Sequence, residues 1–449
     1  MNKKISLGLA ISLVAIGCAI TFVLTWTLSL GIYNSKISSA DKYTGVYEKL
    51  KEMDVTVKAN YIGTLSEENI QNGIINGYVS GIGDKYAGYI PANSYYELQQ
   101  TTSGVVTGPG FEAEDNGSGY LAITYVYKGG SAEANNVKVG DIITEIDGRS
   151  LLSMEPATAL ERISGDVGTK LSLHLLRGTE EFNVSLIRQQ ITISSVTDKM
   201  LGDGIGYIKI SAFNGKTAEQ FSEALNSLRT DGAKSLIIDL RQNSGGTISS
   251  LKPMLNRLIS AAVVATAEYR GGVKKMLIET DSSDIISMKT AILVDGGTAS
   301  AAELFAVALK DEGGAVLVGT QTYGKGVIQN TYELSDGSAL SFSTAKIIPS
   351  KSEPYDGVGL KPDYVIELPA GISLEYLTDE TDTQLQKALE ILSSASPDTS
   401  GDSGTSDTDS SSLPADSSDS ADSTNSSDST EASESSDSTD SSDSSTAAD

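Results

Sequence analysis

The chain of 449 residues contains a single histidine and a single cysteine. The lone cysteine, Cys18, excludes an intramolecular disulfide, so the folded domains must be held together by their cores alone. Without a cluster of histidine and cysteine residues at ligand spacing, the sequence predicts no metal site, and it implies no cofactor. Histidine is the usual general base for a serine nucleophile. Because His174 lies in a strand-like stretch of a separate module, a serine nucleophile in this chain would need another base, most simply a lysine.

Basic residues are missing from the C-terminal part of the chain. From residue 393 the sequence is almost wholly Ser, Asp, Thr, Ala and Gly, and no Lys or Arg follows Lys387. The 14 acidic residues of this tail supply more than half of the formal net charge of −26. The composition predicts a disordered, solvated spacer over residues 393–449, with a wall-associated structural role as the alternative. The remaining surface lacks the clustered positive charge that nucleic acids require, so nucleic acid is not an expected partner.

Charged residues are also absent from residues 5–35. A helix needs about 20 apolar residues to cross the hydrocarbon core of a bilayer, and this run is long enough. Lys3 and Lys4 favour a cytoplasmic N-terminus, while Trp26 and Tyr33 suit the opposite membrane interface.

We therefore expect residues 1–35 to form a cytoplasmic N-terminus and a single transmembrane anchor in the cell membrane, with the rest of the chain on the extracytoplasmic side. A cleaved signal peptide is the alternative, since residues 16–18 loosely resemble a lipoprotein cleavage site with Cys18 as the lipidated residue. The apolar run continues well beyond Cys18, which favours an anchor that is not cleaved.

Residues 36–101 read as a helical region. Apolar side chains recur every three or four residues from Tyr47 to Tyr61, which is one face of a helix, and Ser66 begins a second helix. This region is either a spacer or a helical arm that packs against the rest of the chain or forms a homodimer.

Residues 102–190 form a β-rich unit with strands at 121–127 and around 142–147, a helix at 157–164, and two final strands. This order, with the stretch KVGDIITEIDG, resembles a PDZ domain. In that family a glycine-rich loop binds the terminal carboxylate of a peptide, which then adds a strand to the sheet edge. The resemblance places this loop at Gly108, Pro109, Gly110 and Phe111. The alternative is a glycine-rich turn in an unrelated β-domain.

Residues 191–392 alternate between strands and helices, which predicts an α/β layered core. The predicted strands lie at 204–210, 234–240, 291–297, 314–320, 327–333, 339–346 and 364–367, and the predicted helices lie at 216–232, 249–260 and 299–311.

Three polar loops follow predicted strands, at residues 240–247, 295–300 and 323–329, and loops at strand ends are where α/β folds place their sites. Ser300 lies at the start of a helix, where free N–H groups and the helix dipole can stabilise an oxyanion. The alternative is that Ser300 or Thr298 is only the N-cap.

Lys325 stands between Gly324 and Gly326. A lysine base must be neutral, so its pKa has to fall from the free value of about 10.4, which burial can achieve. Gln329 is a candidate to orient the amine. A solvated turn lysine is the alternative.

Residues 40–392 resemble the C-terminal processing peptidases, also called tail-specific proteases. The stretches IGYIKISAFNGKTAEQF, LIIDLRQNSGG, VDGGTASAAE, GTQTYGKGVIQ and GVGLKPDYVI match the core motifs of this family in order. The resemblance implies a multi-domain α/β protein: a layered serine–lysine peptidase core with an inserted PDZ domain, preceded by the N-terminal helical region and the single anchor.

The same resemblance assigns the site residue by residue: Ser300 as nucleophile, Lys325 as general base, Gln329 as the residue that orients it, and the N–H groups of Gly246 and Ala301 as oxyanion donors. Asp311, at the far end of the nucleophile helix, is expected to be structural, since the helix would separate it from Ser300 by about 16 Å.

Two residues depart from the family pattern. Ser244 replaces a usual proline and would loosen the loop that presents Gly246, and Asp295 replaces a frequent asparagine and would raise the pKa of Lys325 if it points inward. Neither change removes a reacting group. We therefore expect a serine endopeptidase that cleaves proteins recognised at or near their free C-termini through the PDZ domain. The alternative is a membrane-tethered PDZ scaffold without catalytic activity.

Overall fold

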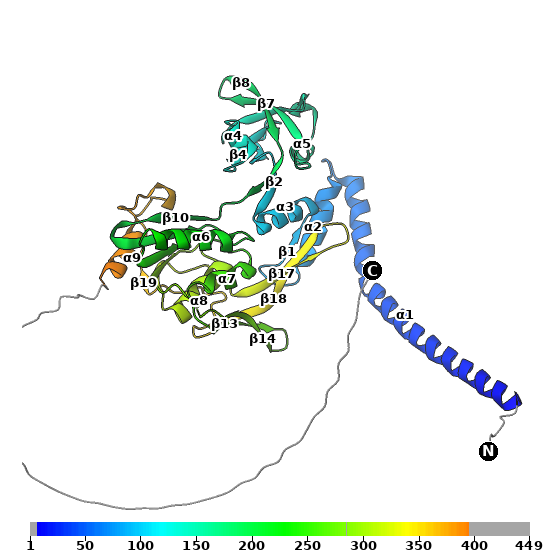
Figure 1. Ribbon diagram of the computed structural model, residues 1–449. Helices are drawn as coiled ribbons and strands as arrows, with labels where there is room; N and C mark the ends of the chain where they lie inside the picture. The colour runs from blue at the N-terminus through cyan, green and yellow to red at the C-terminus, as the bar shows by residue number, and fades with distance from the viewer. Residues whose placement is uncertain (1–6, 284, 395–449) are drawn as a thin grey trace, which may run out of the picture. The chain divides into compact units, whose positions relative to one another are not determined.

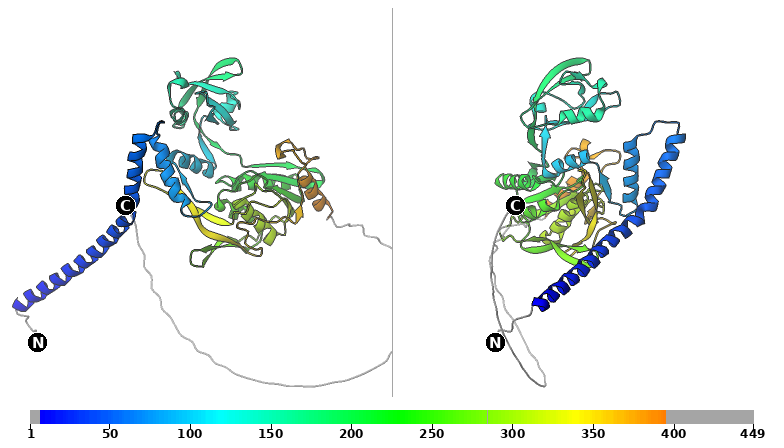
Figure 2. Two further views of the ribbon diagram at one scale, coloured as in Figure 1. Left: turned by 180° about the vertical axis from the view of Figure 1, so that it is seen from behind. Right: turned by 90° about the vertical axis from the view of Figure 1, so that its right-hand side faces the viewer.

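The computed structural model describes residues 7–283 and 285–394 (Figures 1 and 2). Its N-terminal part is helical, as predicted, with three helices: α1 (Leu7–Asn60), α2 (Glu67–Ser80) and α3 (Ala92–Ser103). Ser66 is the N-cap of α2 and accepts a hydrogen bond from the N–H of Asn69. Both figures show α2 turning back alongside the last turns of α1, where Lys58 pairs with Glu67 at 2.6 Å.

Across the described residues, no helix combines the length and the apolar character needed to cross a membrane. The structure therefore does not support the transmembrane anchor that was expected over residues 1–35. Residues 1–6 of that segment and residues 395–449 of the expected spacer lie outside the described residues. The apolar stripe of the first helix is exposed, with Tyr47 and Met53 at 67% and 57% exposure.

Two short paired strands, β2 (Val105–Gly108) and β9 (Gln189–Thr192), begin and end the inserted domain. Between them a sheet has the order β3-β4-β5-β7-β8, so β3 is an edge strand. The members of this domain are β3 (Phe111–Asp115), β4 (Leu121–Val126), α4 (Ser131–Ala134), β5 (Ile142–Ile146), α5 (Pro156–Ile163), β7 (Lys170–Arg177) and β8 (Glu180–Ile187). Alternating apolar residues of these strands form a separate core.

The central sheet has the order β10-β11-β12-β15-β16-β19, and every pair after the antiparallel β10–β11 pair is parallel. Its strands are β10 (Val196–Met200), β11 (Ile205–Ile210), β12 (Ser235–Asp239), β15 (Lys289–Val294), β16 (Val316–Gly319) and β19 (Tyr364–Val365). Because parallel strands share one carboxyl edge, the loops after β12, β15 and β16 meet there, as the sequence predicted.

Helices cover both faces of this sheet. One face packs against the helices α6 (Thr217–Thr230), α7 (Leu251–Leu255) and α8 (Ala301–Gly313) around Phe221 and Phe305. The other face packs against α9 (Thr383–Ser393) through Leu385 and Leu392. Burial on both faces explains the continuous apolar runs of β12 and β15.

A second sheet contains a hairpin that the sequence analysis missed. Strands β13 (Ala262–Tyr269) and β14 (Val273–Thr280) follow α7, which ends at Leu255 although the helix was predicted to continue to residue 260. The β-branched residues of β13 favour a strand. The sheet has the order β1-β18-β13-β14, with β17 on the other edge of β18: β1 (Gly88–Ile90), β17 (Val327–Glu333) and β18 (Ala339–Pro349).

A buried ionic network fixes the end of β12. Arg241 donates to Asp239 at 2.6 Å and to Asp382, the N-cap of α9, at 3.0 Å, and Tyr207 donates to Asp239 at 2.7 Å. Burial lowers the pKa of Arg241, but its bonds to Asp239 and Asp382 raise it by more, so the guanidinium stays charged. Removing one partner would strand a buried charge, so the network holds the start of loop 240–247 firmly.

Candidate active site

Ser300 lies where the loop after β15 enters α8, and it has an unusual backbone. As the N-cap of α8 it has φ 56° and ψ −117°, whereas N-cap residues normally have extended dihedrals. A positive φ in a residue other than glycine costs about 1–3 kcal/mol and persists only where the surroundings enforce it. The N-cap role alone therefore does not account for this conformation. The strained turn presents the serine at the positive end of a buried helix.

The loop after β12 passes directly beside this turn. The N–H of Phe213 donates to the carbonyl of Gly245 at 2.8 Å, and the N–H of Thr247 donates to the carbonyl of Phe213 at 2.7 Å. A Cβ on Gly246 would lie 1.9 Å from that Phe213 carbonyl, and its φ is 133°, so only glycine fits there. Gly246 is therefore held against Phe213 while it lines the same cavity as Ser300.

Two backbone N–H groups at this junction have no hydrogen-bond acceptor within the described residues. Over the described residues, the N–H groups of Gly246 and Ala301 donate to no protein acceptor. Ala301 is the first residue of α8, where an N–H has no intrahelical partner. Free donors beside a serine are what a developing oxyanion would require.

Lys325 is half-buried, and its amine donates a short hydrogen bond to Oε1 of Gln329. The amide nitrogen of Gln329 in turn donates to the carbonyl oxygen of Tyr86 at 2.5 Å. Burial lowers the pKa of Lys325, and the charge of Asp84 raises it by less, so the net shift is downward. The solvated-turn alternative for Lys325 does not fit this environment.

The buried carboxylate of Glu303 ties the serine turn to the lysine loop. Glu303, on the first turn of α8, is fully buried and accepts hydrogen bonds from the N–H groups of Ser300 (2.9 Å), Gly324 (2.8 Å) and Lys325 (2.8 Å). It also accepts one from the hydroxyl of Thr322 at 2.5 Å. The sequence analysis missed Glu303, although a serine followed three residues later by glutamate at a helix start is the signature of a capping box.

A cavity of about 700 Å³ brings the predicted site residues together. Its lining includes Ser300, Lys325, Gln329 and Gly246, and Ala301 follows Ser300 as the first residue of α8. Over the described residues no hydrogen bond joins the Ser300 hydroxyl directly to the Lys325 amine. Part of the wall comes from α3 and the residues that precede it, which the sequence did not place at the site: Tyr86, Gly88, Ile90, Leu98 and Thr102.

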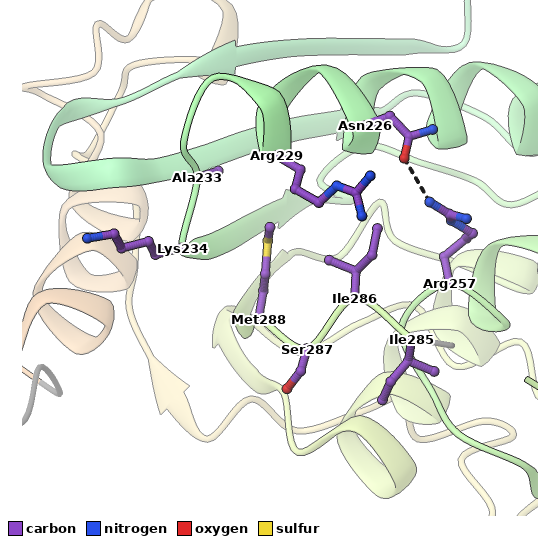
Figure 3. A pocket seen from close by; sticks show the side chains of 9 residues that line it. All are labelled: Asn226, Arg229, Ala233, Lys234, Arg257, Ile285, Ile286, Ser287 and Met288. Atoms are coloured by element: carbon purple, nitrogen blue, oxygen red, sulfur yellow. Dashed lines mark hydrogen bonds between the residues drawn. The ribbon is translucent and has the colours of Figure 1, made fainter. Parts of the chain in front are cut away.

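Another cavity, of about 600 Å³, lies where the strands of the central sheet begin (Figure 3). Arg229 and Arg257 extend into it from either side, and Asn226 accepts a hydrogen bond from Arg257 at 2.8 Å. Its lining includes Lys234 and Ser287 but no carboxylate, and Ser287 does not stand at the start of a helix, so this cavity does not offer the chemistry found around Ser300.

The two departures from the family pattern are accommodated. Asp295 turns toward Gln242, accepting from its N–H at 2.9 Å and its side-chain amide at 2.7 Å, and it is Asp84 that raises the pKa of Lys325. Ser244 is exposed in a loop that is fixed at Gly245, whose N–H donates to Asn243 at 2.8 Å.

Two further residues lie away from the cavity lining. Asp311 accepts from the N–H groups of Lys351 at 3.1 Å and Ser352 at 2.9 Å, so it anchors a loop at the far end of α8. His174 lies on β7 of the inserted domain, where its ring is bonded to the hydroxyl of Thr144 at 2.8 Å. Neither residue lines the cavity that holds Ser300.

Comparison with known proteins shows which families the chain matches. Residues 204–366 match peptidase family S41, and residues 102–176 match the PDZ domain. The carboxy-terminal processing protease CtpA of Bacillus subtilis is 31% identical to this chain over 388 residues, which cover 84% of this chain and 83% of the relative. The chain belongs to the carboxy-terminal processing protease family. A probable CtpA-like serine protease of Staphylococcus saprophyticus is 28% identical over 387 residues, covering 86% of this chain and 78% of that protein.

Among solved structures, the photosystem II D1 C-terminal processing protease is 23% identical, with a TM-score of 0.41 over 72% of this chain and 88% of that chain. The S41 match contains every residue of the catalytic cavity that lies in the core, from Ser244 to Ser341. The predicted family is thus confirmed. The protein is a serine-type peptidase with a mixed α/β peptidase fold and a PDZ domain.

We expect Glu303→Ala to abolish cleavage of casein and to lower the free energy of unfolding by about 3 kcal/mol or more. The change leaves three N–H groups without an acceptor: that of Gly324 is buried, and those of Ser300 and Lys325 are partly buried. A buried donor without an acceptor costs about 1–3 kcal/mol. Chemical denaturation and a casein digest measure the two effects. Thr322→Val, which removes the hydroxyl donor to Glu303 and leaves the N–H of Leu360 without its acceptor, should cost less.

The matched control for this prediction is Glu223→Ala on α6, because that glutamate is exposed. Its effect on the free energy of unfolding should stay within about 0.5 kcal/mol. Wild-type activity and stability in Glu303→Ala would show that the carboxylate does not organise the site.

Proposed function

We propose that this peptidase uses Ser300 as its nucleophile and Lys325 as its general base. The observation that carries the proposal is the shared cavity: a strained serine at a helix N-terminus lines it together with a half-buried amine. Glutamine, a neutral partner, accepts the hydrogen bond from that amine and leaves it free to lose its charge. The serine–lysine pair is a known variant of nucleophilic catalysis.

In the proposed reaction, the neutral amine of Lys325 takes the proton of the Ser300 hydroxyl as its oxygen attacks the scissile carbonyl carbon. The N–H groups of Gly246 and Ala301 hold the oxyanion. The C–N bond then breaks, the ammonium of Lys325 returns the proton to the leaving amine, and an acyl-enzyme remains. Water, activated by the same amine, hydrolyses the ester and releases the new C-terminus. Gln329 keeps the amine directed into the cavity.

We expect Ser300→Ala and Lys325→Ala each to abolish cleavage of an unstructured protein while the fold persists. In the wild type, kcat/KM should rise with pH, because the base is active only when neutral. The midpoint of this rise should lie below the usual pKa range of lysine, because burial lowers the pKa of Lys325. Digestion of fluorescently labelled casein between about pH 5 and 10 measures the profile.

Circular dichroism of both variants provides the control for folding. Retained cleavage by either folded variant would refute the assignment of roles. A wild-type protein that binds peptides without cleaving any protein would instead favour the scaffold alternative.

We further propose that the PDZ domain recognises the free C-terminus of substrates at residues 108–111. The carbonyls of Pro109 and Gly110 accept from the N–H groups of Ala132 and Tyr127, both at 2.9 Å, and so face the interior of the domain. A trans peptide places each N–H opposite the preceding carbonyl, so the N–H groups of Gly110 and Phe111 face the other way. Two adjacent outward amides suit a carboxylate.

The strand that follows this loop supports the same proposal. β3 is the edge strand of the PDZ sheet, and α5 packs close to it. An extended peptide whose carboxylate binds at Phe111 can add to the free side of β3 by main-chain hydrogen bonds.

A peptide substrate with a free C-terminus should be cleaved at a higher kcat/KM than the same peptide with a C-terminal amide. Amidation removes the charge that the outward N–H groups would bind. Binding of both peptides to Ser300→Ala, followed by fluorescence anisotropy, separates recognition from chemistry. Equal affinity for the two forms would refute carboxylate recognition.

The sequence also supports a proposed location of the catalytic domains outside the cytoplasm. Lys3 and Lys4 followed by the uncharged run of residues 5–35 are typical of exported chains. In intact bacterial cells, added protease should therefore degrade the PDZ and peptidase domains while it spares a cytoplasmic marker. Protection of the catalytic domains until the cells are lysed would refute this location.

A further inference from the structure

The short segment of residues 84–86, between α2 and β1, reaches the catalytic lysine from a distant part of the chain. β1 pairs antiparallel with β18, from Gly88 opposite Ser341 to Ile90 opposite Ala339. This pairing fixes the preceding residues beside the catalytic cavity, and Tyr86 lines that cavity. The segment is thus held by the second sheet.

Tyr86 contacts the catalytic lysine, and it also contacts Gly324 and Gln329, which stand before and after that lysine in the sequence. Its carbonyl oxygen accepts from the amide of Gln329 at 2.5 Å, which sets the amide so that its oxygen faces Lys325. Its hydroxyl donates to the carbonyl of Gly324 at 3.0 Å. Its ring centroid lies 5.1 Å from the Lys325 amine, a distance at which the ring favours the charged form.

Asp84 is the carboxylate that acts on the charge of Lys325. It accepts from the N–H of Ser343 at 2.7 Å, from the Ser343 hydroxyl at 3.1 Å, and from the N–H of Tyr86 at 3.0 Å. Burial raises the pKa of Asp84, but these hydrogen bonds lower it by more, so the group is charged at neutral pH. Ser343 is the partner of Gln329 in the β17–β18 ladder. Asp84 is therefore fixed close to the lysine and opposes the effect of burial on its pKa.

The other charged groups around the lysine loop are engaged elsewhere. Glu303 binds the main-chain N–H groups described above. Asp356 accepts from the N–H of Gly326 at 3.1 Å. Lys85 is exposed, and its amine lies 4.5 Å from the centroid of the Tyr86 ring. None of these groups has the effect of Asp84 on the amine of Lys325.

We propose that Asp84 and Tyr86 are positioning residues of the catalytic centre. The main chain of Tyr86 fixes Gln329, and the carboxylate of Asp84 together with the ring of Tyr86 sets the pH range in which Lys325 is a neutral base. This inference rests on the roles proposed for Ser300 and Lys325. It makes the N-terminal region a working part of the active site, and excludes the spacer interpretation for residues 84–86.

The test is the pH profile of kcat/KM for labelled casein in Asp84→Asn. Removing the charge should move the acid limb of the profile to lower pH, because the ammonium form of Lys325 loses a stabilising partner. A matched control is Asp336→Asn: Asp336 accepts from the N–H and hydroxyl of Ser338 in the β17–β18 turn, but does not act on Lys325. Its profile should coincide with that of the wild type.

A lower activity of Asp84→Asn at every pH, with an unchanged midpoint, would overturn the proposal and leave Asp84 a purely structural role. Ser343→Ala, which removes a hydroxyl donor but keeps the charge, should leave the midpoint in place. If Asp84→Asn fails to fold, a second measurement tests the proposal: the rate at which an amine-reactive reagent labels Lys325, followed across pH in Asp84→Glu and in Tyr86→Leu. The midpoint of the labelling profile should shift to lower pH in Tyr86→Leu. It should not shift in Asp84→Glu, which keeps the charge. An unshifted Tyr86→Leu profile, or a shift in Asp84→Glu, would overturn the proposal.

Failure of this inference is distinct from failure of the proposed function. If Lys325→Ala retains cleavage, the base itself is wrongly assigned. If Lys325→Ala is inactive but Asp84→Asn shows no shift, only the role of Asp84 is refuted.

Discussion

The cavity that holds Ser300 and Lys325 depends on one buried carboxylate. Glu303 accepts hydrogen bonds from the serine turn and from the lysine loop, which follow different strands of the central sheet. The carboxylate gains charge-assisted hydrogen bonds, and the two loops gain a fixed separation. Because these donors are buried or partly buried and would otherwise lack an acceptor, the loss of any of these contacts would destabilise the site. The strained dihedrals of Ser300 are held by the same bonds, since its N–H is one of the four donors.

The sequence proposed Ser300 and Lys325 as the reacting groups, but apart from Gln329 it did not identify the residues that hold them in place. Ser300 and Lys325 stand out because each lies in a polar loop that follows a predicted strand, and Gln329 lies only four residues beyond the lysine. Glu303 carries a local signal as a capping residue, but its bonds to Gly324 and Lys325 cross more than twenty residues and follow only from the fold. The carbonyl of Tyr86 carries no signal at all, because every residue has one, and it meets Gln329 across 243 positions.

For the fold, too, local sequence patterns predicted some elements and missed others. The parallel strands β12 and β15 were predictable, because burial on both faces requires short, continuous apolar runs. The β13–β14 hairpin was not, because its first strand follows a helix without a turn signal and its second strand is largely exposed and charged. The contact of Arg241 with Asp382 joins groups 141 positions apart, and a single charged residue in a sequence does not identify its partner. Long-range pairing thus decides what local patterns leave open.

The surroundings of Lys325 have two opposing effects on its proton affinity. A lysine that was only desolvated would become neutral easily but would return a proton reluctantly, and the reaction requires both transfers. A lysine beside an unopposed carboxylate would stay charged and could not accept the serine proton. Burial lowers the pKa of Lys325, and Asp84 with the ring of Tyr86 stabilises its charged form. Because the two effects come from different parts of the chain, the core and the residues before β1, the proton affinity of the proposed base depends on contact between them. A change that loosens residues 84–86 therefore acts on the chemistry without touching either reacting atom.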